Sequence, residues 1–292
     1  MAVPDIAAAL AAAARPVLAT LADPGFAAEV ATRAGLDVAA VRPRLDDIAG
    51  EARLALGHLA RPRLALAAGQ RVLEVGAGTG ALATILAGAG LAVTALEPIV
   101  AGFDLFDHVH AALRARHPEA PPLDRREARA LDPARDGRFD RIVSINVLEH
   151  CRPLGPTLDA LAAVLASGGR MLHACPNYRV PYEPHLGAWL LPGRPAWTAR
   201  LRPGLADDAI WRTLNFITAG DLRRFARRHR LDLALEPGVL GDAIARIGED
   251  PAFARRQGGV ARVAKLVERT GLVAALPAAW VTPMVAIVVR PA

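Results

Sequence analysis

Apolar residues recur at helical spacing through the first 68 positions, and prolines interrupt the pattern at Pro16, Pro24, Pro43 and Pro62. Because proline breaks or kinks a helix, this pattern predicts several short helices. We therefore expect residues 1–68 to form an N-terminal helical cap ahead of the main domain.

From residue 71 the pattern changes to short apolar runs that alternate with helix-like segments. "RVLEV" ends in a glycine turn, the helix-like "ALATILAGAG" follows, and a second apolar run, "LAVTALE", comes next. Parallel strands need a crossover helix between them, so this is a β-α-β unit. The alternation continues with a helix at 104–116, the strand "FDRIVSINVL", the helix "PTLDALAAVLA" and the strand "GGRMLHAC". It predicts a doubly wound α/β domain.

Beyond Cys175 the regular alternation stops and later returns. An irregular stretch runs to about residue 215, and a helix at 218–229, the strand "LDLALEP", a helical region and a last strand follow. We expect one main domain over residues 69–292, with an insertion at about 176–215 and a helical addition at about 239–272.

Composition and charge exclude several classes of protein. The apolar share of 53% is too high for a disordered chain. The net charge is +6, and nearly all of the positive charge is carried by arginine. The densest basic run, "RRFARRHR", has the spacing of a solvated helix face. We therefore expect no nucleic-acid partner.

The two cysteines, Cys151 and Cys175, form no CxxC motif and cannot build a disulfide framework. A reducing cytoplasm is the expected location.

The uncharged stretch at 270–289 has nearly the length of a membrane span, but Pro277 and Pro283 interrupt it and its end is rich in β-branched residues. We expect a buried final strand there and no membrane span.

The segment "VLEVGAGTG" places Gly76, Gly78 and Gly80 between the first strand and its helix. Glycine lets a ligand lie against the backbone and allows the positive φ of a tight turn. Gly76, Gly78 and Ala81 also satisfy the dinucleotide pattern G-x-G-x-x-A. The glycines alone therefore leave two cofactor classes open.

Two acids separate these classes. Glu97 closes the second strand, where its carboxylate can accept hydrogen bonds from both ribose hydroxyls of either cofactor. Glu74 lies inside the first strand, two residues before the turn. A carboxylate there would repel a pyrophosphate and suits a sulfonium with an α-ammonium group. Glu74 therefore favours S-adenosylmethionine over a dinucleotide as the cofactor. The alternative is that Glu74 is a buried acid with a structural role.

Four segments follow one another over about residues 68–177: "VLEVGAGTG", "VTALEP", "FDRIVSINVLEH" and "SGGRMLHACPN". In order and spacing they resemble the successive motifs of the class I S-adenosylmethionine-dependent methyltransferases of the ubiquinone-biosynthesis-like group. The resemblance implies a Rossmann-like methyltransferase fold with a mainly parallel seven-stranded sheet. It also implies which residues bind each part of the cofactor. The methionine part is held by Glu74, Gly76, Ala77, Gly78 and Gly80, the ribose by Glu97, the adenine edge by Glu127 and Ala128, and the methyl-facing side by Asn146 and Val147. Pro98 belongs to the same cofactor-binding set.

Methyl transfer requires alignment of the reacting groups, and an oxygen of high pKa also needs a base. His150 follows the fourth strand and is either catalytic or a cap of the next helix. Tyr178, Glu183 and His185 follow the fifth strand, and a Glu-x-His pair can orient an imidazole as a base. A rigid proline-rich loop is the alternative role for these three residues.

We expect no metal, because His173, Cys175 and His185 lack the spacing of a known ligand set.

The sequence predicts an S-adenosylmethionine-dependent methyltransferase that takes part in biosynthesis and methylates a small or medium-sized molecule at oxygen. The alternatives are an NAD(P)-dependent oxidoreductase and a protein that binds S-adenosylmethionine without catalysis. A homodimer is the assembly that we consider.

Overall fold

The computed structural model describes residues 5–99, 104–258, 260, 264, 266, 269–271, 273 and 276–292. The chain divides into two compact units. The first comprises residues 1–144, 163–170 and 292, and the second comprises residues 145–162 and 171–291. Each unit is described by itself below.

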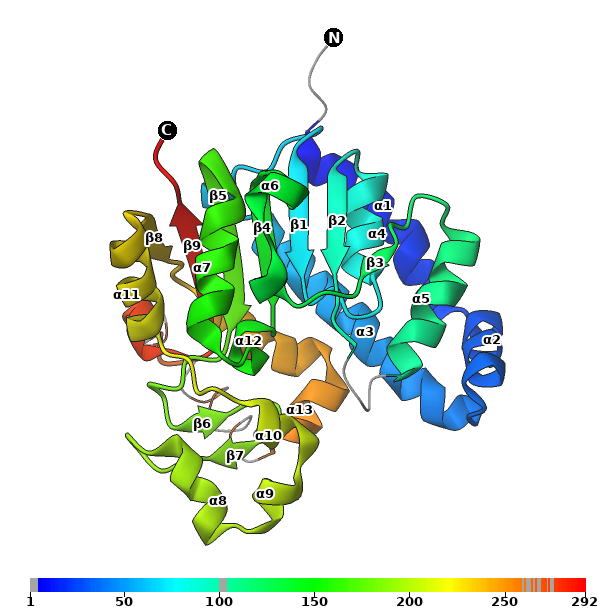
Figure 1. The fold of residues 1–292 in the computed structure, drawn as a ribbon. Helices are drawn as coiled ribbons and strands as arrows, with labels where there is room; N and C mark the ends of the chain where they lie inside the picture. Colours follow the sequence, from blue (N-terminus) through cyan, green and yellow to red (C-terminus); the bar gives the residue numbers. More distant parts are fainter. Residues whose placement is uncertain are drawn as a thin grey trace. The chain divides into compact units, whose positions relative to one another are not determined.

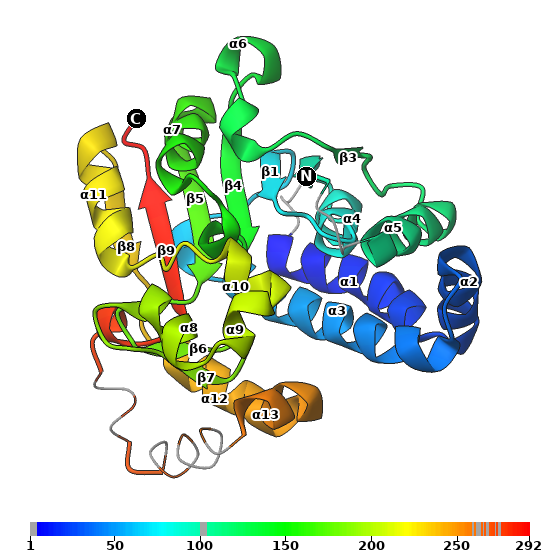
Figure 2. The same ribbon diagram turned by 60° about the horizontal axis from the view of Figure 1, so that its bottom comes forward.

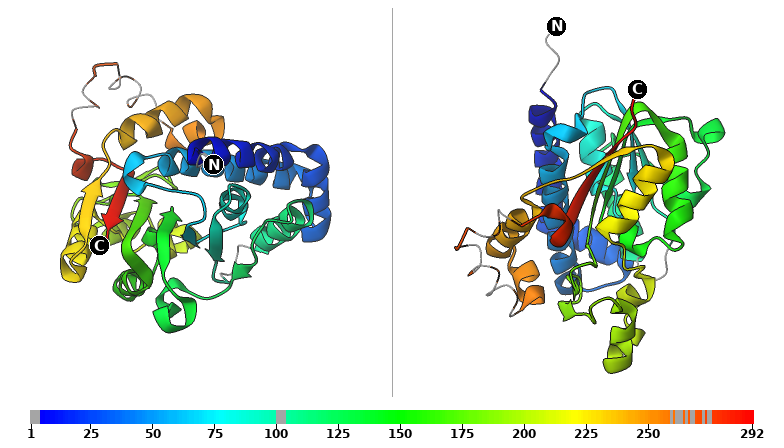
Figure 3. Two further views of the ribbon diagram at one scale, coloured as in Figure 1. Left: turned by 90° about the horizontal axis from the view of Figure 1, so that it is seen from above. Right: turned by 90° about the vertical axis from the view of Figure 1, so that its left-hand side faces the viewer.

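Three helices open the first unit, as the sequence predicts: α1 (Ile6–Ala22), α2 (Pro24–Ala34) and α3 (Val38–Leu59). Asp5, Asp23 and Asp37 cap their N-termini by accepting backbone N–H groups. Figures 2 and 3 show α1 and α3 side by side, and both contact α4 (Ala81–Gly88).

The expectation that every proline interrupts a helix is wrong at two positions. Pro16 lies inside α1 and Pro43 inside α3, whereas Pro24 begins α2 and Pro62 begins a 3-10 turn. A proline removes one helical hydrogen bond, and the buried apolar face of each long helix supplies the packing that holds the remaining turns together.

The first unit contains β1 (Arg71–Val75), β2 (Ala92–Leu96) and the short β3 (Leu123–Asp124) (Figure 1). Strands β1 and β2 pair in parallel, and β1 also pairs in parallel with β4 (Phe139–Ile145). Helix α5 (Asp104–Arg116) has the bounds that the sequence predicts. Strand β3 lies in the proline-rich link for which the sequence predicts no strand, and its two residues pair with the end of β2.

The remaining strands are β5 (Leu165–Cys175), β8 (Asp232–Leu235) and β9 (Met284–Val289). The seven strands form one sheet in the order β3-β2-β1-β4-β5-β9-β8, and β9 is antiparallel to β8. This confirms the predicted mainly parallel, doubly wound α/β fold and the final buried strand. Helix α7 (Leu154–Val164) and α11 (Ala219–His229) are present as predicted.

The predicted insertion contains short elements. Strands β6 (Tyr182–Glu183) and β7 (Ala188–Trp189) form a hairpin, and α8 (Thr198–Leu201), α9 (Gly204–Asp207) and α10 (Ala209–Thr213) follow. In the predicted helical addition, α12 (Val239–Glu249) and α13 (Pro251–Gln257) are helical, and part of the remainder lies outside the described residues.

Within the described ranges, no single helix combines the length and the apolar composition that a membrane crossing requires. Helices α1 and α2, bent by 63° at their junction, meet that criterion only when they are counted together.

Candidate functional site

The glycine turn after β1 has a geometry that side chains would disturb. Gly76, Gly78 and Gly80 all have positive φ, and the Gly76 N–H donates to the Leu96 carbonyl at 2.7 Å. A Cβ added to Gly80 would lie 2.6 Å from Nδ1 of His110. The turn therefore has a backbone conformation that only glycine adopts without strain, and Gly76 and Gly78 are partly exposed in it.

Glu97 joins the end of β2 to this turn. Its Oε2 accepts a hydrogen bond from the Gly78 N–H at 2.8 Å. Burial raises the pKa of Glu97, and the Gly78 amide and the nearby Arg125 oppose that rise. The carboxyl group thus lies beside the glycine turn, as the two motifs predict.

Glu74 is buried in the middle of the parallel strands, opposite Ala95 of β2 and Val143 of β4. Its Oε2 has no hydrogen-bond partner among the described residues. Burial and the charge of Glu97 raise the pKa of Glu74 well above its ordinary value, with the Ala83 amide acting in the opposite direction. Two acids with raised pKa values, one of them beside the glycine turn, fit a cationic ligand, so these residues suit the predicted cofactor.

The predicted cofactor residues further along the chain are Glu127, Ala128, Asn146 and Val147. Ala128 is buried at the start of a 3-10 turn, while the exposed Glu127 pairs with Arg129. Asn146 and Val147 belong to the second unit. Asn146 has a φ of 55°, which asparagine tolerates better than most residues, and its N–H donates to the Ala174 carbonyl at 2.8 Å.

In the second unit, Glu183 is the centre of the predicted Tyr178, Glu183 and His185 group. The backbone N–H of His185 and its Nδ1 both lie 2.7 Å from Glu183 Oε1, and the Tyr178 hydroxyl donates to Glu183 Oε2. Burial raises the pKa of Glu183, but the hydrogen bonds from His185 and Tyr178 outweigh it and hold the pKa below its ordinary value. Glu183 is therefore an ionised carboxylate that accepts the Nδ1 proton of His185.

Tyr178 and His150 are neutral partners of this group. Burial beside the Glu183 carboxylate raises the pKa of Tyr178, so the phenol keeps its proton. Burial and the neighbouring His185 lower the pKa of His150 to about 4, so its imidazole is uncharged at neutral pH. The two imidazole ring centres are 5.7 Å apart. Nδ1 of His150 bonds the Thr213 hydroxyl at 2.6 Å, which is a different role from the helix cap considered above.

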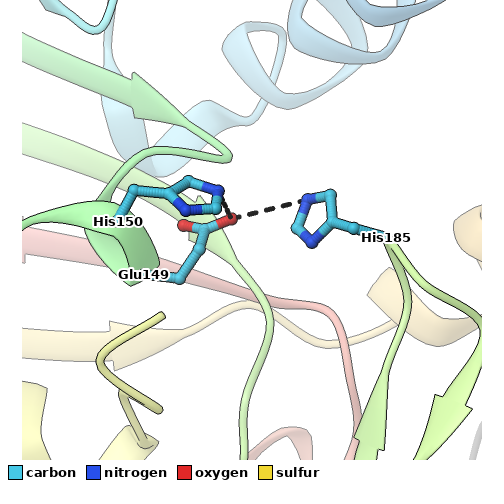
Figure 4. Close-up of side chains that lie close together, drawn as sticks. All are labelled: Glu149, His150 and His185. Carbon is cyan, nitrogen blue, oxygen red and sulfur yellow. Dashed lines mark ion pairs between the residues drawn. The ribbon is translucent and has the colours of Figure 1, made fainter. Parts of the chain in front are cut away.

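Glu149 is a residue that the sequence analysis missed. It is buried in the 3-10 turn Leu148–His150, and its Oε1 lies 3.7 Å from Nε2 of His185 and 3.9 Å from Nε2 of His150 (Figure 4). Both rings turn towards this oxygen in Figure 4. The sequence signal was an acid directly before a candidate histidine. We use the name acid–histidine cluster for Glu149, His150, Glu183 and His185.

Asn215 holds the 3-10 turn that carries Glu149 and His150. The sequence analysis missed this residue too. Its Nδ2 donates to the carbonyls of Leu148 and Cys151 at 2.6 and 2.8 Å, and its N–H donates to the Glu149 carbonyl at 2.8 Å. Three hydrogen bonds from one residue fix the backbone on both sides of His150.

Asn177 gives the predicted loop its framework. It is buried, and its amide Nδ2 donates to the carbonyls of Ala279 and Val281, while its Oδ1 accepts from the N–H groups of Arg179 and Ala219. The loop therefore combines both roles considered from the sequence: Asn177 shapes its backbone, and Tyr178, Glu183 and His185 meet in one cluster.

A pocket of about 490 Å³ lies in the second unit. Its lining includes Arg152, Trp211, Arg212, Asn215 and Phe216. The Phe216 ring also meets the Tyr178 ring edge to face at 5.3 Å, so the pocket lining reaches the residues around Glu183. The volume is within the range of about 300–1,000 Å³ that small-molecule sites occupy.

Comparison with known proteins gives a family match. Residues 49–234 match the family model described as methyltransferase domain. Uncharacterised proteins of two Mycobacterium tuberculosis strains, CDC 1551 and H37Rv, are 30% identical over 244 residues, which cover 80% of this chain and 82% of each relative. A ubiquinone biosynthesis O-methyltransferase of Nitrobacter winogradskyi is 26% identical over 184 residues, with 59% of this chain and 60% of that protein covered.

Two solved structures share the fold. The [4+2]-cyclase SpnF is 20% identical, with a TM-score of 0.51 and coverage of 82% of this chain and 81% of the cyclase. Phosphoethanolamine N-methyltransferase 2 of Haemonchus contortus, in complex with S-adenosyl-L-methionine, is 14% identical, with a TM-score of 0.50 and coverage of 82% of this chain and 52% of that enzyme. Because a cyclase and a methyltransferase both resemble the chain, the fold by itself does not select one reaction.

Proposed function

The chain belongs to the methyltransferase domain family and is an S-adenosylmethionine-dependent methyltransferase, and from this premise we propose that it methylates an oxygen atom of a small molecule. The observation that carries the proposal is the acid–histidine cluster. It supplies a proton acceptor, the Nε2 of His185, that is oriented by the ionised Glu183. Such a pair serves an oxygen nucleophile, which must lose a proton during the reaction.

The first unit supplies most of the residues proposed for the cofactor, and Asn146 and Val147 of the second unit complete the set. When bound, S-adenosylmethionine provides a methyl group that its sulfonium has already activated for transfer. We propose that Glu74 faces the cationic part, that Glu97 accepts hydrogen bonds from the ribose hydroxyls, and that the glycine turn lies against the ligand. The Glu127 and Ala128 region would contact the adenine edge.

The second unit supplies the residues for proton removal. The Tyr178 hydroxyl and the His185 N–H groups hold the Glu183 carboxylate in one position, so the Nδ1 proton of His185 stays on the side of Glu183. Nε2 of His185 is then the atom that accepts the substrate proton, and Glu183 stabilises the resulting imidazolium. The relative from Nitrobacter, named an O-methyltransferase, supports oxygen as the target.

The substrate proposal rests on the pocket of the second unit. Its volume suits a small molecule, and its lining combines the aromatic rings of Trp211 and Phe216 with the side chains of Arg152 and Arg212. Flat faces and positive charges of this kind favour an aromatic or conjugated molecule that carries an anionic group. A cytoplasmic location and a homodimer remain predictions of the sequence.

Incubation with S-adenosylmethionine labelled with ¹³C at the methyl group tests the proposal. Extracts of the source organism supply the substrate, and the carbon chemical shift of the labelled product identifies the atom methylated. We expect the shift of a methyl ether or ester. A labelled N-methyl or C-methyl product would contradict the oxygen proposal, and release of no labelled product alongside tight cofactor binding would favour the non-catalytic alternative.

Cofactor affinity is expected to rise with pH because the pKa values of Glu74 and Glu97 are both raised. An acid with a raised pKa stays protonated to a higher pH, and only its carboxylate attracts a cation. Calorimetric titration with S-adenosylmethionine from about pH 5 to pH 8 should therefore give a Kd that falls as these acids ionise. Glu74→Gln should lose part of this dependence. A constant Kd in the unmodified chain would contradict the proposed role of both acids.

A further inference from the structure

Three side chains of the second unit bring possible metal-ligand atoms close together, and the proposed proton transfer does not require this arrangement. Glu149 Oε1, a ring nitrogen of His150 and a ring nitrogen of His185 all lie within 4.8 Å of one another. Both imidazoles approach the carboxylate through Nε2 (Figure 4). A general base needs one histidine, whereas this arrangement has two around one buried carboxyl group.

The hydrogen bonds of His150 determine which of its nitrogens holds the proton. The Thr213 hydroxyl donates its proton to the Ile210 carbonyl at 2.7 Å. The same hydroxyl oxygen, 2.6 Å from Nδ1 of His150, must then accept the Nδ1 proton. Nε2 of the neutral ring is left with a lone pair that faces Glu149.

His185 is oriented in the same way by a different partner. Its Nδ1 donates to Glu183 Oε1 at 2.7 Å, and Glu183 is fixed in turn by the Tyr178 hydroxyl. Carboxylate–histidine–metal arrangements of this form set the ring orientation and increase the basicity of the nitrogen that binds the ion. Nε2 of His185 also faces Glu149.

We propose that Glu149, His150 and His185 bind one divalent transition-metal ion, with zinc as the best match. Two imidazole nitrogens and one carboxylate oxygen form a ligand set that suits zinc and disfavours magnesium, which prefers oxygen ligands. Three protein ligands leave a coordination position open for water or an oxygen of a small molecule. The expectation of no metal considered His173 and Cys175 with His185, whereas folding brings a different set together.

The two distances from the Glu149 carboxylate to the imidazoles require only a small contraction. With zinc–ligand bonds of about 2.1 Å at tetrahedral angles, ligand atoms lie about 3.4 Å apart. The observed 3.7 and 3.9 Å from Glu149 Oε1 to the two Nε2 atoms exceed this value by a few tenths of an ångström. The side chains of His150 and His185 are partly exposed, so an ion can enter from solvent.

The inference does not depend on the proposed methylation, because metal binding is measurable without substrate or cofactor. The ion and a proton compete for the same lone pair on His185. In the metal-bound chain the ion therefore replaces the base as the group that favours deprotonation of a bound oxygen.

Metal binding to the purified full-length chain tests the proposal. After removal of bound ions with a chelator, dialysis against zinc and elemental analysis should give about one ion per chain. Titration with cobalt should give the visible absorption of a four- or five-coordinate site, and millimolar magnesium should not displace the cobalt. Failure of the unmodified chain to bind zinc or cobalt at micromolar concentration would overturn the proposal, as would displacement of cobalt by magnesium.

Variants assign the binding to these residues. Glu149→Gln and His150→Ala should each weaken zinc binding by about 10-fold or more. His229→Ala is the matched control, because His229 also lies beside a carboxylate, 2.8 Å from Asp159, outside the proposed site. Unchanged zinc affinity in both site variants would overturn the assignment. Circular dichroism identifies any variant that fails to fold, and the cobalt spectrum of the unmodified chain then remains the deciding measurement.

Discussion

Replacement of Glu183 by glutamine is expected to lower the rate of methyl transfer by about 100-fold or more. Glutamine has nearly the same size but no charge, so it cannot stabilise a protonated His185. Its amide also adds donors where the structure already directs three donor groups, from Tyr178 and His185, at the carboxylate. The rate is measured as formation of S-adenosylhomocysteine with the substrate identified by the labelling experiment.

The affinity for S-adenosylmethionine separates a chemical role of Glu183 from a structural one. We expect the Kd of the cofactor to stay within about twofold in Glu183→Gln, because Glu183 is not among the residues assigned to cofactor binding. His185→Ala should show the same loss of rate at an unchanged Kd. Tyr182→Phe is the matched control. It removes a hydroxyl that donates to Gln257 from the neighbouring position of the same hairpin, and it should leave the rate nearly unchanged.

An unchanged rate in Glu183→Gln or in His185→Ala would show that the loop is structural. A parallel loss of rate and melting temperature in all three variants would also count against a chemical role, because it would trace the effect to the stability of the hairpin.

The first unit could be predicted closely because its signals are local. Gly76, Gly78 and Gly80 follow directly after an apolar run, and Glu97 ends the next one, so the order of residues along the chain already implies a turn closed by an acid. The parallel direction of β1 and β2 then follows from the β-α-β connection. The contact between Gly80 and His110 was not predictable, because it depends on how α5 packs against the turn.

The second unit shows where sequence reasoning ends. Glu183 and His185 are two residues apart, and their pairing is a local event that the sequence could predict. Glu149 is brought to His185 only by folding, across 36 positions, and Thr213 is brought to His150 across 63. No periodicity or spacing along the chain encodes such contacts, so the sequence analysis assigns no role to Glu149. The prediction that Pro16 interrupts a helix is wrong because a local signal was given too much weight. Packing over the whole of α1 outweighs the one hydrogen bond that the proline removes.

Removal of the carboxylate at Glu97 should weaken cofactor binding by about 100-fold or more, because hydrogen bonds to a charged group contribute about 1.5–3 kcal/mol each and two ribose hydroxyls would lose their acceptor. In the free chain Glu97 Oε2 also accepts the Gly78 N–H, so Glu97→Ala additionally loosens the glycine turn. Glu97→Gln keeps one acceptor oxygen and should have a smaller effect. Calorimetry with S-adenosylmethionine and with S-adenosylhomocysteine measures both variants.

The two ligands distinguish a ribose contact from a general effect of charge. They share the ribose and differ in the charge on sulfur, so a hydrogen-bonding role predicts equal losses for both in Glu97→Ala. A loss confined to S-adenosylmethionine would instead show that Glu97 acts only through its charge. Asp107→Asn is the control, because Asp107 is an exposed acid that raises the pKa of Glu97. Its neutralisation should lower the pKa of Glu97 and leave the affinity within about twofold, since an exposed charge is screened by solvent.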